Sequence, residues 1–203
     1  YIGMRGQIGT AVIGVGGMGS VHAMWSYILP ESDLKAVCDI NEDRAKEIAA
    51  KYKCDWYTDY HKMLERKDID AVIVVTPNLL HAPIAIDVVK AGKHVAVEKP
   101  LTVSLKDAGE MIKAVKKAGV HDAYFENLPF SPSYSMARQI IDAGGLGEVY
   151  FARVNECGGN GLQSLKPLKD AKKYFGMEWG YLLQGGCHPI QLSRVLFDRE
   201  PAK

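Results

Sequence analysis

The sequence lacks the features that mark several large classes of protein. It has four cysteines among 203 residues and no CxxC pair, which excludes a zinc ribbon or a thioredoxin-like redox motif. No apolar stretch approaches the roughly 18 residues that a membrane-spanning helix needs, and residues 1–7 lack the charged and apolar regions of a signal peptide. We therefore expect reduced thiols, a cytoplasmic location and no contact with a membrane.

Long runs of one charge are also missing. The formal net charge is +1, and like charges occur at most in pairs, so nucleic acid and anionic membranes are not expected partners. Cys187 and His188 are adjacent, and no third metal ligand follows at a usual spacing, so no metal site is expected. With 47% apolar and 24% charged residues, the composition is that of a globular protein. These features favour a small-molecule substrate.

Short apolar segments, rich in β-branched residues, alternate with segments that have helical spacing. We expect strands at residues 10–15, 34–39, 71–75 and 94–97, and helices at 20–29, from 41 onward, at 82–90 and at 105–117. Strands separated by helices form parallel sheets, in which ligands bind beyond the carboxyl ends of the strands. The pattern predicts a doubly wound α/β domain.

The pattern changes near Tyr124, where residues 125–132 contain two prolines. We place a domain boundary there, with the doubly wound domain at 1–124 and part of an α+β domain at 125–203. In the second domain we expect a helix at 133–143, a strand at 148–154 and a helix at 188–197.

A glycine-rich turn joins the first expected strand to its helix. Gly14, Gly16 and Gly19 form the pattern G-x-G-x-x-G, with Gly17 and Met18 between the last two, and Asp39 ends the second strand. The pattern allows a tight turn, close approach of a pyrophosphate and packing of helix on strand. The acidic residue would accept hydrogen bonds from the ribose and repel the 2′-phosphate of NADP, so NAD is favoured. We expect Arg44 to be a solvated partner of neighbouring acids.

Two further groups of residues follow strands. Thr76-Pro77-Asn78 comes after the third expected strand and Glu98-Lys99-Pro100 after the fourth, where loops cross the cofactor crevice. Lysines are usually solvated, but Lys99 lies between an acid and a conformationally restricted proline at the end of a strand. This placement makes Lys99 a candidate functional residue.

These segments together resemble the glucose-fructose oxidoreductase, inositol dehydrogenase and MocA-like family. The resemblance runs from about residue 9 to 197. The segments that carry it are GVGGMG at 14–19, TPNLLHAPIAIDVVKAGKHVAVEKPL at 76–101, EN at 126–127, IIDAGGLGEVYFARV at 140–154 and GGCHPI at 185–190.

The resemblance implies hydride transfer between a nicotinamide and a carbon bearing a hydroxyl, on a sugar, cyclitol or related polyol. Lys99 matches the catalytic lysine, which hydrogen-bonds the reacting oxygen and helps to move its proton. His188 matches the acid/base residue, and imidazole titrates near neutrality. The resemblance also implies a set of cofactor-lining positions: Thr76, Pro77, Asn78, His81, Glu98, Lys99 and Asn127.

Two departures from the family pattern qualify these expectations. The family has an aspartate four residues before the histidine, where this chain has Gln184, a neutral amide at a catalytic position. The family also continues into a large open-faced sheet, which this chain lacks after Lys203, so the chain appears truncated. For a full-length member, the resemblance implies homodimers or homotetramers that assemble through that sheet. Besides a dehydrogenase, an NAD-dependent glycosidase and a non-catalytic NAD-binding protein stay open.

Overall fold

The computed structural model describes residues 6–154 and 180–198, and for 180–184 only the backbone. The chain divides into two compact units, Tyr1–Tyr124 and Phe125–Lys203. Each unit is described here by itself. In the described residues, no helix is both long and apolar enough to cross a membrane.

Unit 1 contains a six-stranded sheet. The strands follow the order β3-β2-β1-β4-β5-β6 across the sheet, and the pairs from β3 to β5 are parallel. This confirms the predicted doubly wound α/β fold. The strand order reverses between β1 and β4, which is where ligands bind in such sheets. The bounds are β1 Ile8–Ile13, β2 Ser32–Cys38, β3 Asp55–Tyr57, β4 Ala71–Val74, β5 His94–Glu98 and β6 Asp122–Phe125.

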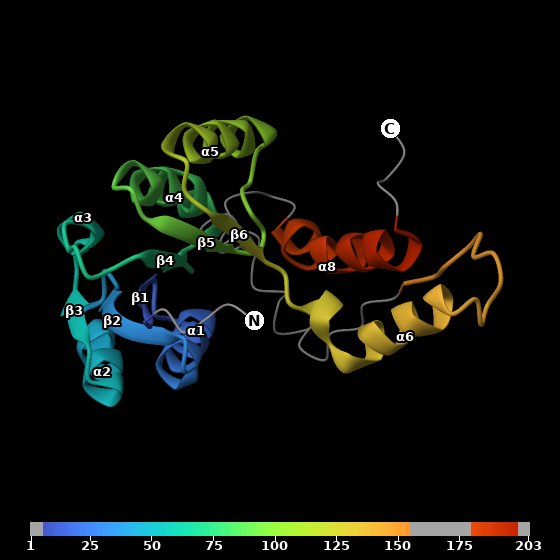
Figure 1. Ribbon diagram of the computed structural model, residues 1–203. Coiled ribbons are helices and arrows are strands. Elements are labelled where there is room, and N and C mark those ends of the chain that lie inside the picture. The colour runs from blue at the N-terminus through green and yellow to red at the C-terminus, as the bar shows by residue number, and fades with distance from the viewer. Residues whose placement is uncertain (1–5, 155–179, 199–203) are drawn as a thin grey trace. The chain divides into compact units, whose positions relative to one another are not determined.

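Helices cover both faces of the sheet (Figure 1). Successive strand side chains point to opposite faces, so Ala11 and Ile13 of β1 belong to one core while Val12 belongs to the other. One face packs against α1 and α2, and the other against α3, α4 and α5. The helices are α1 Gly17–Ile28, α2 Glu42–Tyr52, α3 Tyr60–Leu64, α4 His81–Lys90 and α5 Leu105–Ala118.

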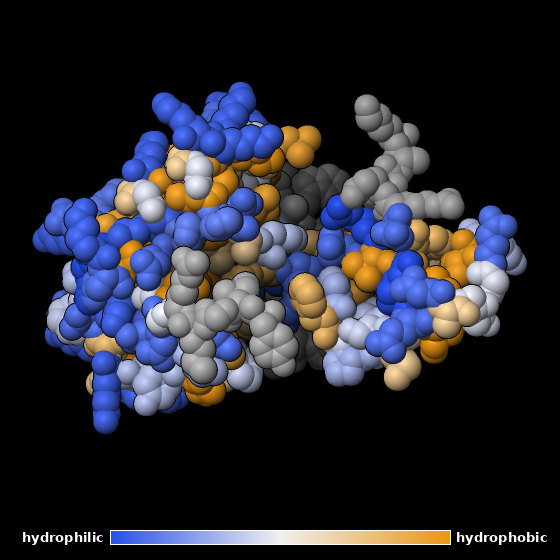
Figure 2. Space-filling view, viewed as in Figure 1, coloured by the Kyte–Doolittle hydropathy of each residue, from blue (hydrophilic) through white to orange (hydrophobic). Residues whose placement is uncertain are grey.

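Local sequence signals set the helix ends in this unit. The side chain of Asn41 accepts a hydrogen bond from Arg44 N at the start of α2, and Ser104 does the same with Asp107 N at the start of α5. Gly119, with φ at 66°, ends α5. α5 is amphipathic: Met111 is buried, and most outward side chains are hydrophilic, as the blue surface over α5 in Figure 2 shows, although Leu105 and Ile112 are exposed.

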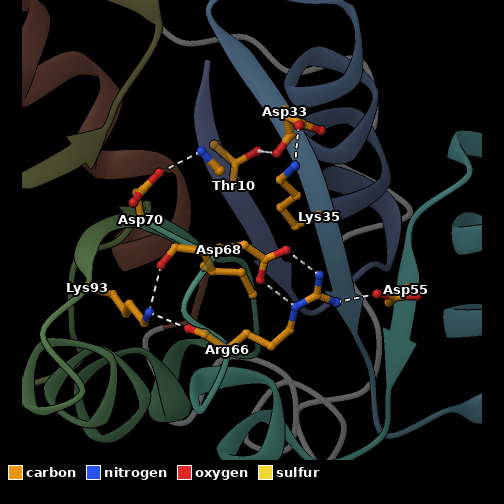
Figure 3. A network of polar contacts seen from close by, with 10 residues as sticks. Thr10, Asp33, Lys35, Asp55, Arg66, Asp68, Asp70 and Lys93 are labelled. Carbon is orange, nitrogen blue, oxygen red and sulfur yellow. Dashed lines mark hydrogen bonds and ion pairs between the residues drawn. The ribbon is translucent and has the colours of Figure 1, made fainter. Parts of the chain in front are cut away.

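Polar contacts join the segments at the amino ends of the strands, at the end of the sheet opposite the glycine turn (Figure 3). Arg66 forms ion pairs with Asp68, at 2.7 Å, and with Asp55. The Lys93 ammonium donates to the carbonyl oxygens of Arg66 and Ile69 at 2.6 and 2.7 Å. The Lys93 ammonium thereby satisfies two carbonyl groups of the segment that leads into β4.

Unit 2 differs from the expectation in two places. α8 spans Gly180–Phe197 and so begins eight residues before the predicted start at His188, because it packs on α6 (Pro132–Asp142) and on the 3-10 helix η2 (Leu128–Phe130). The strand predicted at 148–154 is absent; the described residues of unit 2 offer it no pairing strand. Arg138 of α6 donates to the carbonyls of Val195 and Leu196 at 3.1 Å, which satisfies the end of α8.

Candidate functional site

Packing within unit 1 requires two of the glycines in the turn after β1. Gly14 has φ at +85°, and a methyl group there would lie 2.6 Å from the carbonyl oxygen of Val75. A methyl group at Gly19 would lie 1.8 Å from the carbonyl oxygen of Gly14. The turn therefore needs glycine at both positions to bring the start of α1 against β1 and β4.

Gly16 differs, because no contact within unit 1 demands a glycine there. The atom nearest to a methyl group at this position is Arg44 Nη1 at 3.9 Å, and φ is −69°. Gly16 is also the N-cap of α1, and within the described residues no side chain caps this helix. Unpaired N–H groups at a helix start attract anions. Gly17 and Met18 follow on the same turn, and Met18 is exposed.

Asp39 lies beside this turn with its carboxylate held in place. The side chain is buried, Oδ2 accepts from Val15 N at 3.0 Å and Oδ1 accepts from Asn41 N at 2.9 Å. Arg44 Nη1 lies 3.4 Å from Oδ2, so the arginine is a partner of this acid, as expected from the sequence. The arrangement presents a fixed negative charge next to the glycine turn.

The residues after β4 lie close to the same turn. A methyl group on Gly14 would lie 3.1 Å from Thr76 N. The hydroxyl oxygen of Thr76 is buried and has no hydrogen-bond partner among the described residues. Asn78, which begins the 3-10 helix η1 (Asn78–Leu80), is buried, whereas Pro77 is exposed. This orphaned hydroxyl can therefore hydrogen-bond a water or a ligand.

His81 holds two loops together. Its ring is 1% exposed, with Nδ1 2.8 Å from the carbonyl oxygen of Pro100 and Nε2 2.8 Å from that of Thr76. Both ring nitrogens therefore lie within hydrogen-bond distance of backbone oxygens of the loops after β4 and β5, and the neutral ring donates to one of them. The resemblance places His81 among cofactor-lining positions, whereas these contacts favour a role in shaping the two loops.

The burial of His81 predicts a dependence of stability on pH. Desolvation lowers the pKa of this imidazole below its ordinary value of 6.5, so the unfolded chain binds a proton more readily than the folded one. The free energy of unfolding should consequently fall as the pH drops below about 6.5. Denaturant titrations of the parent and of His81→Gln between pH 5 and 8 test this. An equally steep fall in the variant would contradict the assignment to His81.

Glu98 and Lys99 lie at the carboxyl end of β5. Glu98 is buried, and its Oε1 lies 3.4 Å from Nε2 of His22, which belongs to α1. Lys99 is half-buried and precedes Pro100. The sequence did not point to His22, because a histidine within a helix gives no signal of a partner in a distant strand.

His188 of unit 2 contacts a carboxylate. Its Nδ1 lies 2.6 Å from Oε2 of Glu126, although the two groups are not aligned as in a hydrogen bond. The side chains are 14% and 2% exposed. Asn127 is exposed, and Gln184 lies on α8 one turn before His188, with its side chain outside the described residues. The sequence offered no sign that Glu126 and His188 meet.

Glu126, Cys187 and His188 are also a group whose ligand atoms lie within 4.8 Å of one another. The sequence predicted no metal site, and Glu126 supplies the third ligand type that it lacked. Two ligands of one zinc ion lie about 3.4 Å apart, given bonds of about 2.1 Å and tetrahedral angles. At 2.6 Å, Nδ1 and Oε2 are too close for that, and we interpret the pair as a direct contact.

Comparison with known proteins assigns this chain to a family. Residues 8–125 match the oxidoreductase family with an NAD-binding Rossmann fold that includes glucose-fructose oxidoreductase, inositol dehydrogenase and MocA-like proteins. The chain belongs to this family. The matched residues include the glycine turn, Asp39 and the segments after β4 and β5, so the resemblance seen in the sequence is confirmed.

Curated relatives include inositol dehydrogenases. The chain is 36% identical over 200 residues to scyllo-inositol 2-dehydrogenase (NAD(+)) of Bacillus subtilis, covering 97% of this chain and 56% of the relative. It is 29% identical over 190 residues to myo-inositol 2-dehydrogenase of Thermotoga maritima, covering 93% and 54%. The crystal structure of GenD2 from gentamicin A biosynthesis in complex with NAD superposes with a TM-score of 0.81 and 28% identity, covering 95% and 54%. The chain thus spans about half the length of these relatives.

Proposed function

We propose that this chain is the cofactor-binding half of an NAD-dependent oxidoreductase that acts on a secondary alcohol of a cyclitol, sugar or similar polyol. Membership of the family and the names of the relatives support this class of reaction. The observation that carries the proposal is Gly16. This glycine lies at the uncapped start of α1, and no contact within unit 1 requires a glycine there.

The residues of unit 1 fit a dinucleotide. The N–H groups at the start of α1, with Gly16, Gly17 and Met18, would bind the pyrophosphate, and Asp39 would accept hydrogen bonds from the adenosine ribose. The fixed carboxylate favours NAD over NADP, since a 2′-phosphate would lie against it. Thr76 would use its orphaned hydroxyl toward the bound cofactor. Pro77, Asn78, Glu98 and Asn127 complete the proposed lining.

The bound nicotinamide supplies a hydride acceptor at its C4. Lys99 Nζ donates a hydrogen bond to the reacting oxygen, which stabilises negative charge on that oxygen as the C–H bond breaks. His188 accepts the hydroxyl proton during oxidation and returns it during reduction. Gln184, one turn before His188, would contact the substrate as a neutral donor and acceptor.

Substitution of Gly16 by alanine tests the cofactor site. The methyl group would meet only Arg44 Nη1, at 3.9 Å, which is an ordinary van der Waals contact with a flexible side chain, so the thermal midpoint should stay unchanged. It would intrude on the pyrophosphate, and the Kd for NAD should rise about 10- to 100-fold, from a cost of about 1–3 kcal/mol. Titration of NAD and NADP, followed by tryptophan fluorescence, measures this.

A matched control is Gly109→Ala on α5, where a methyl group meets nothing within 4 Å. This variant should bind NAD as the parent does. The parent should bind NAD more tightly than NADP. Unchanged NAD binding by Gly16→Ala would refute the proposed position of the pyrophosphate, and tighter binding of NADP would refute the role of Asp39.

A further inference from the structure

Glu126 is the carboxylate that His188 contacts, and Gln184 brings no charge to the preceding turn of the same helix. We propose that Glu126 is a positioning residue for His188: it holds the imidazole in the form whose Nε2 is free to accept a proton. This inference rests on the proposed function of His188 as acid/base, and it adds a residue that the sequence did not single out for catalysis.

The carboxylate of Glu126 is held from two sides. Its Oε1 accepts a hydrogen bond from Leu128 N at 3.2 Å, across the turn that leads from β6 into η2. Its Oε2 is left for His188 Nδ1, at 2.6 Å. The side chain is 2% exposed, so water does not compete for this oxygen. A buried carboxylate is retained only where hydrogen bonds or an opposite charge compensate its desolvation. The hydrogen bond from Leu128 N supplies part of that compensation, and His188 Nδ1 is the polar atom beside the other oxygen.

The short separation determines where a proton must be. A deprotonated Nδ1 and a carboxylate oxygen both carry lone pairs, which repel each other at 2.6 Å. A proton on either atom removes that repulsion, and it lies on Nδ1 because imidazole is a stronger base than a carboxylate. In the neutral ring the other nitrogen, Nε2, then carries the lone pair, and this is the atom that can take a hydroxyl proton. Carboxylate and imidazole together therefore select one tautomer, as a partner on the second nitrogen does for histidines that bind metals.

The contact between Glu126 and His188 forms only in the folded chain, because the two residues lie far apart in the sequence. Glu126 follows β6 directly, and His188 lies in the middle of α8, which packs on η2. Replacing Glu126 by glutamine keeps the size of the side chain and removes its charge. An amide can donate or accept at this place, so it does not select the tautomer.

Two-bond nitrogen–proton NMR correlation of the full-length protein, labelled with ¹⁵N-histidine, reads the tautomer directly and requires no substrate. His188→Asn identifies the His188 signals among those of the other histidines, of which this chain has five. We expect the parent and Glu126→Asp to show a ring protonated at Nδ1, and Glu126→Gln to lose that preference. The matched control Glu110→Gln, an exposed acid on α5, should leave the pattern unchanged. The same tautomer in the parent and in Glu126→Gln would overturn the inference.

Turnover provides the second readout. Glu126→Gln should lower kcat about 10- to 100-fold with KM changed less than threefold, a loss below that of removing a general base outright. Adding Gln184→Asp should restore part of kcat, because it returns a carboxylate one turn before His188. A protein that shows the Nδ1 tautomer but no oxidation of any polyol would refute the proposed function and leave the contact intact. If a chelator changes the His188 signals, a metal ion binds at Glu126 and His188, and the interpretation as a direct contact is wrong.

Discussion

Gly19→Ala is expected to lower the free energy of unfolding by about 3 kcal/mol or more, at the upper end for overpacking. The added methyl group would lie 1.8 Å from the carbonyl oxygen of Gly14. That oxygen belongs to the backbone and has no rotamer into which it can move. Gly14 cannot shift either, since its own φ is +85° and it lies against the backbone of Val75. Denaturant titration followed by circular dichroism measures the loss.

Gly109→Ala again serves as the control, because its methyl group lies in open space on a helix. Alanine is the better helix former, and this variant should be as stable as the parent or more so. The contradicting outcome is a Gly19→Ala variant whose free energy of unfolding lies within about 1 kcal/mol of the parent's, which is roughly the contribution of one buried methylene. Such a result would show that the turn can rearrange. The close packing of α1 on β1 would then not explain the glycine.

Lys99→Ala is expected to lower kcat for polyol oxidation about 10²- to 10⁴-fold, the range for loss of one acid–base group. The NAD affinity should change much less than kcat, because the proposed pyrophosphate and ribose contacts lie on other loops. Absorbance of NADH across inositols and hexoses measures turnover in the full-length protein. Lys99→Arg retains the charge but not the compact ammonium, so it should recover little activity.

Lys113→Ala, on the exposed face of α5, is the matched control and should turn over like the parent. Full activity of Lys99→Ala would refute the role of this lysine. If the parent binds NAD but yields NADH from no polyol, assays of glycoside cleavage separate the remaining alternatives. Cleavage without net NADH would favour the glycosidase, and its absence would favour a non-catalytic NAD-binding protein.

Segments with a strong local pattern could be predicted from the sequence. The strands and helices at the centre of unit 1 follow from apolar runs, helix caps and terminal glycines, and these signals depend on near neighbours in the chain. β3, α3 and β6 have three, five and four residues, too few to show a period. The early start of α8 was missed because Gly185, Gly186 and Pro189 are poor helix residues, and packing against α6 and η2 compensates.

The sequence by itself determined the fold class, the family and the type of cofactor site, since a strand, a glycine turn, a helix and an acid occur at fixed spacing. Tertiary structure decided the partner of each polar group. It showed that Gly16 is open while Gly19 is packed, that His81 joins two loops and that Glu126 meets His188. Contacts between residues far apart in the chain leave no period in the sequence, because they arise only when the elements carrying them pack together.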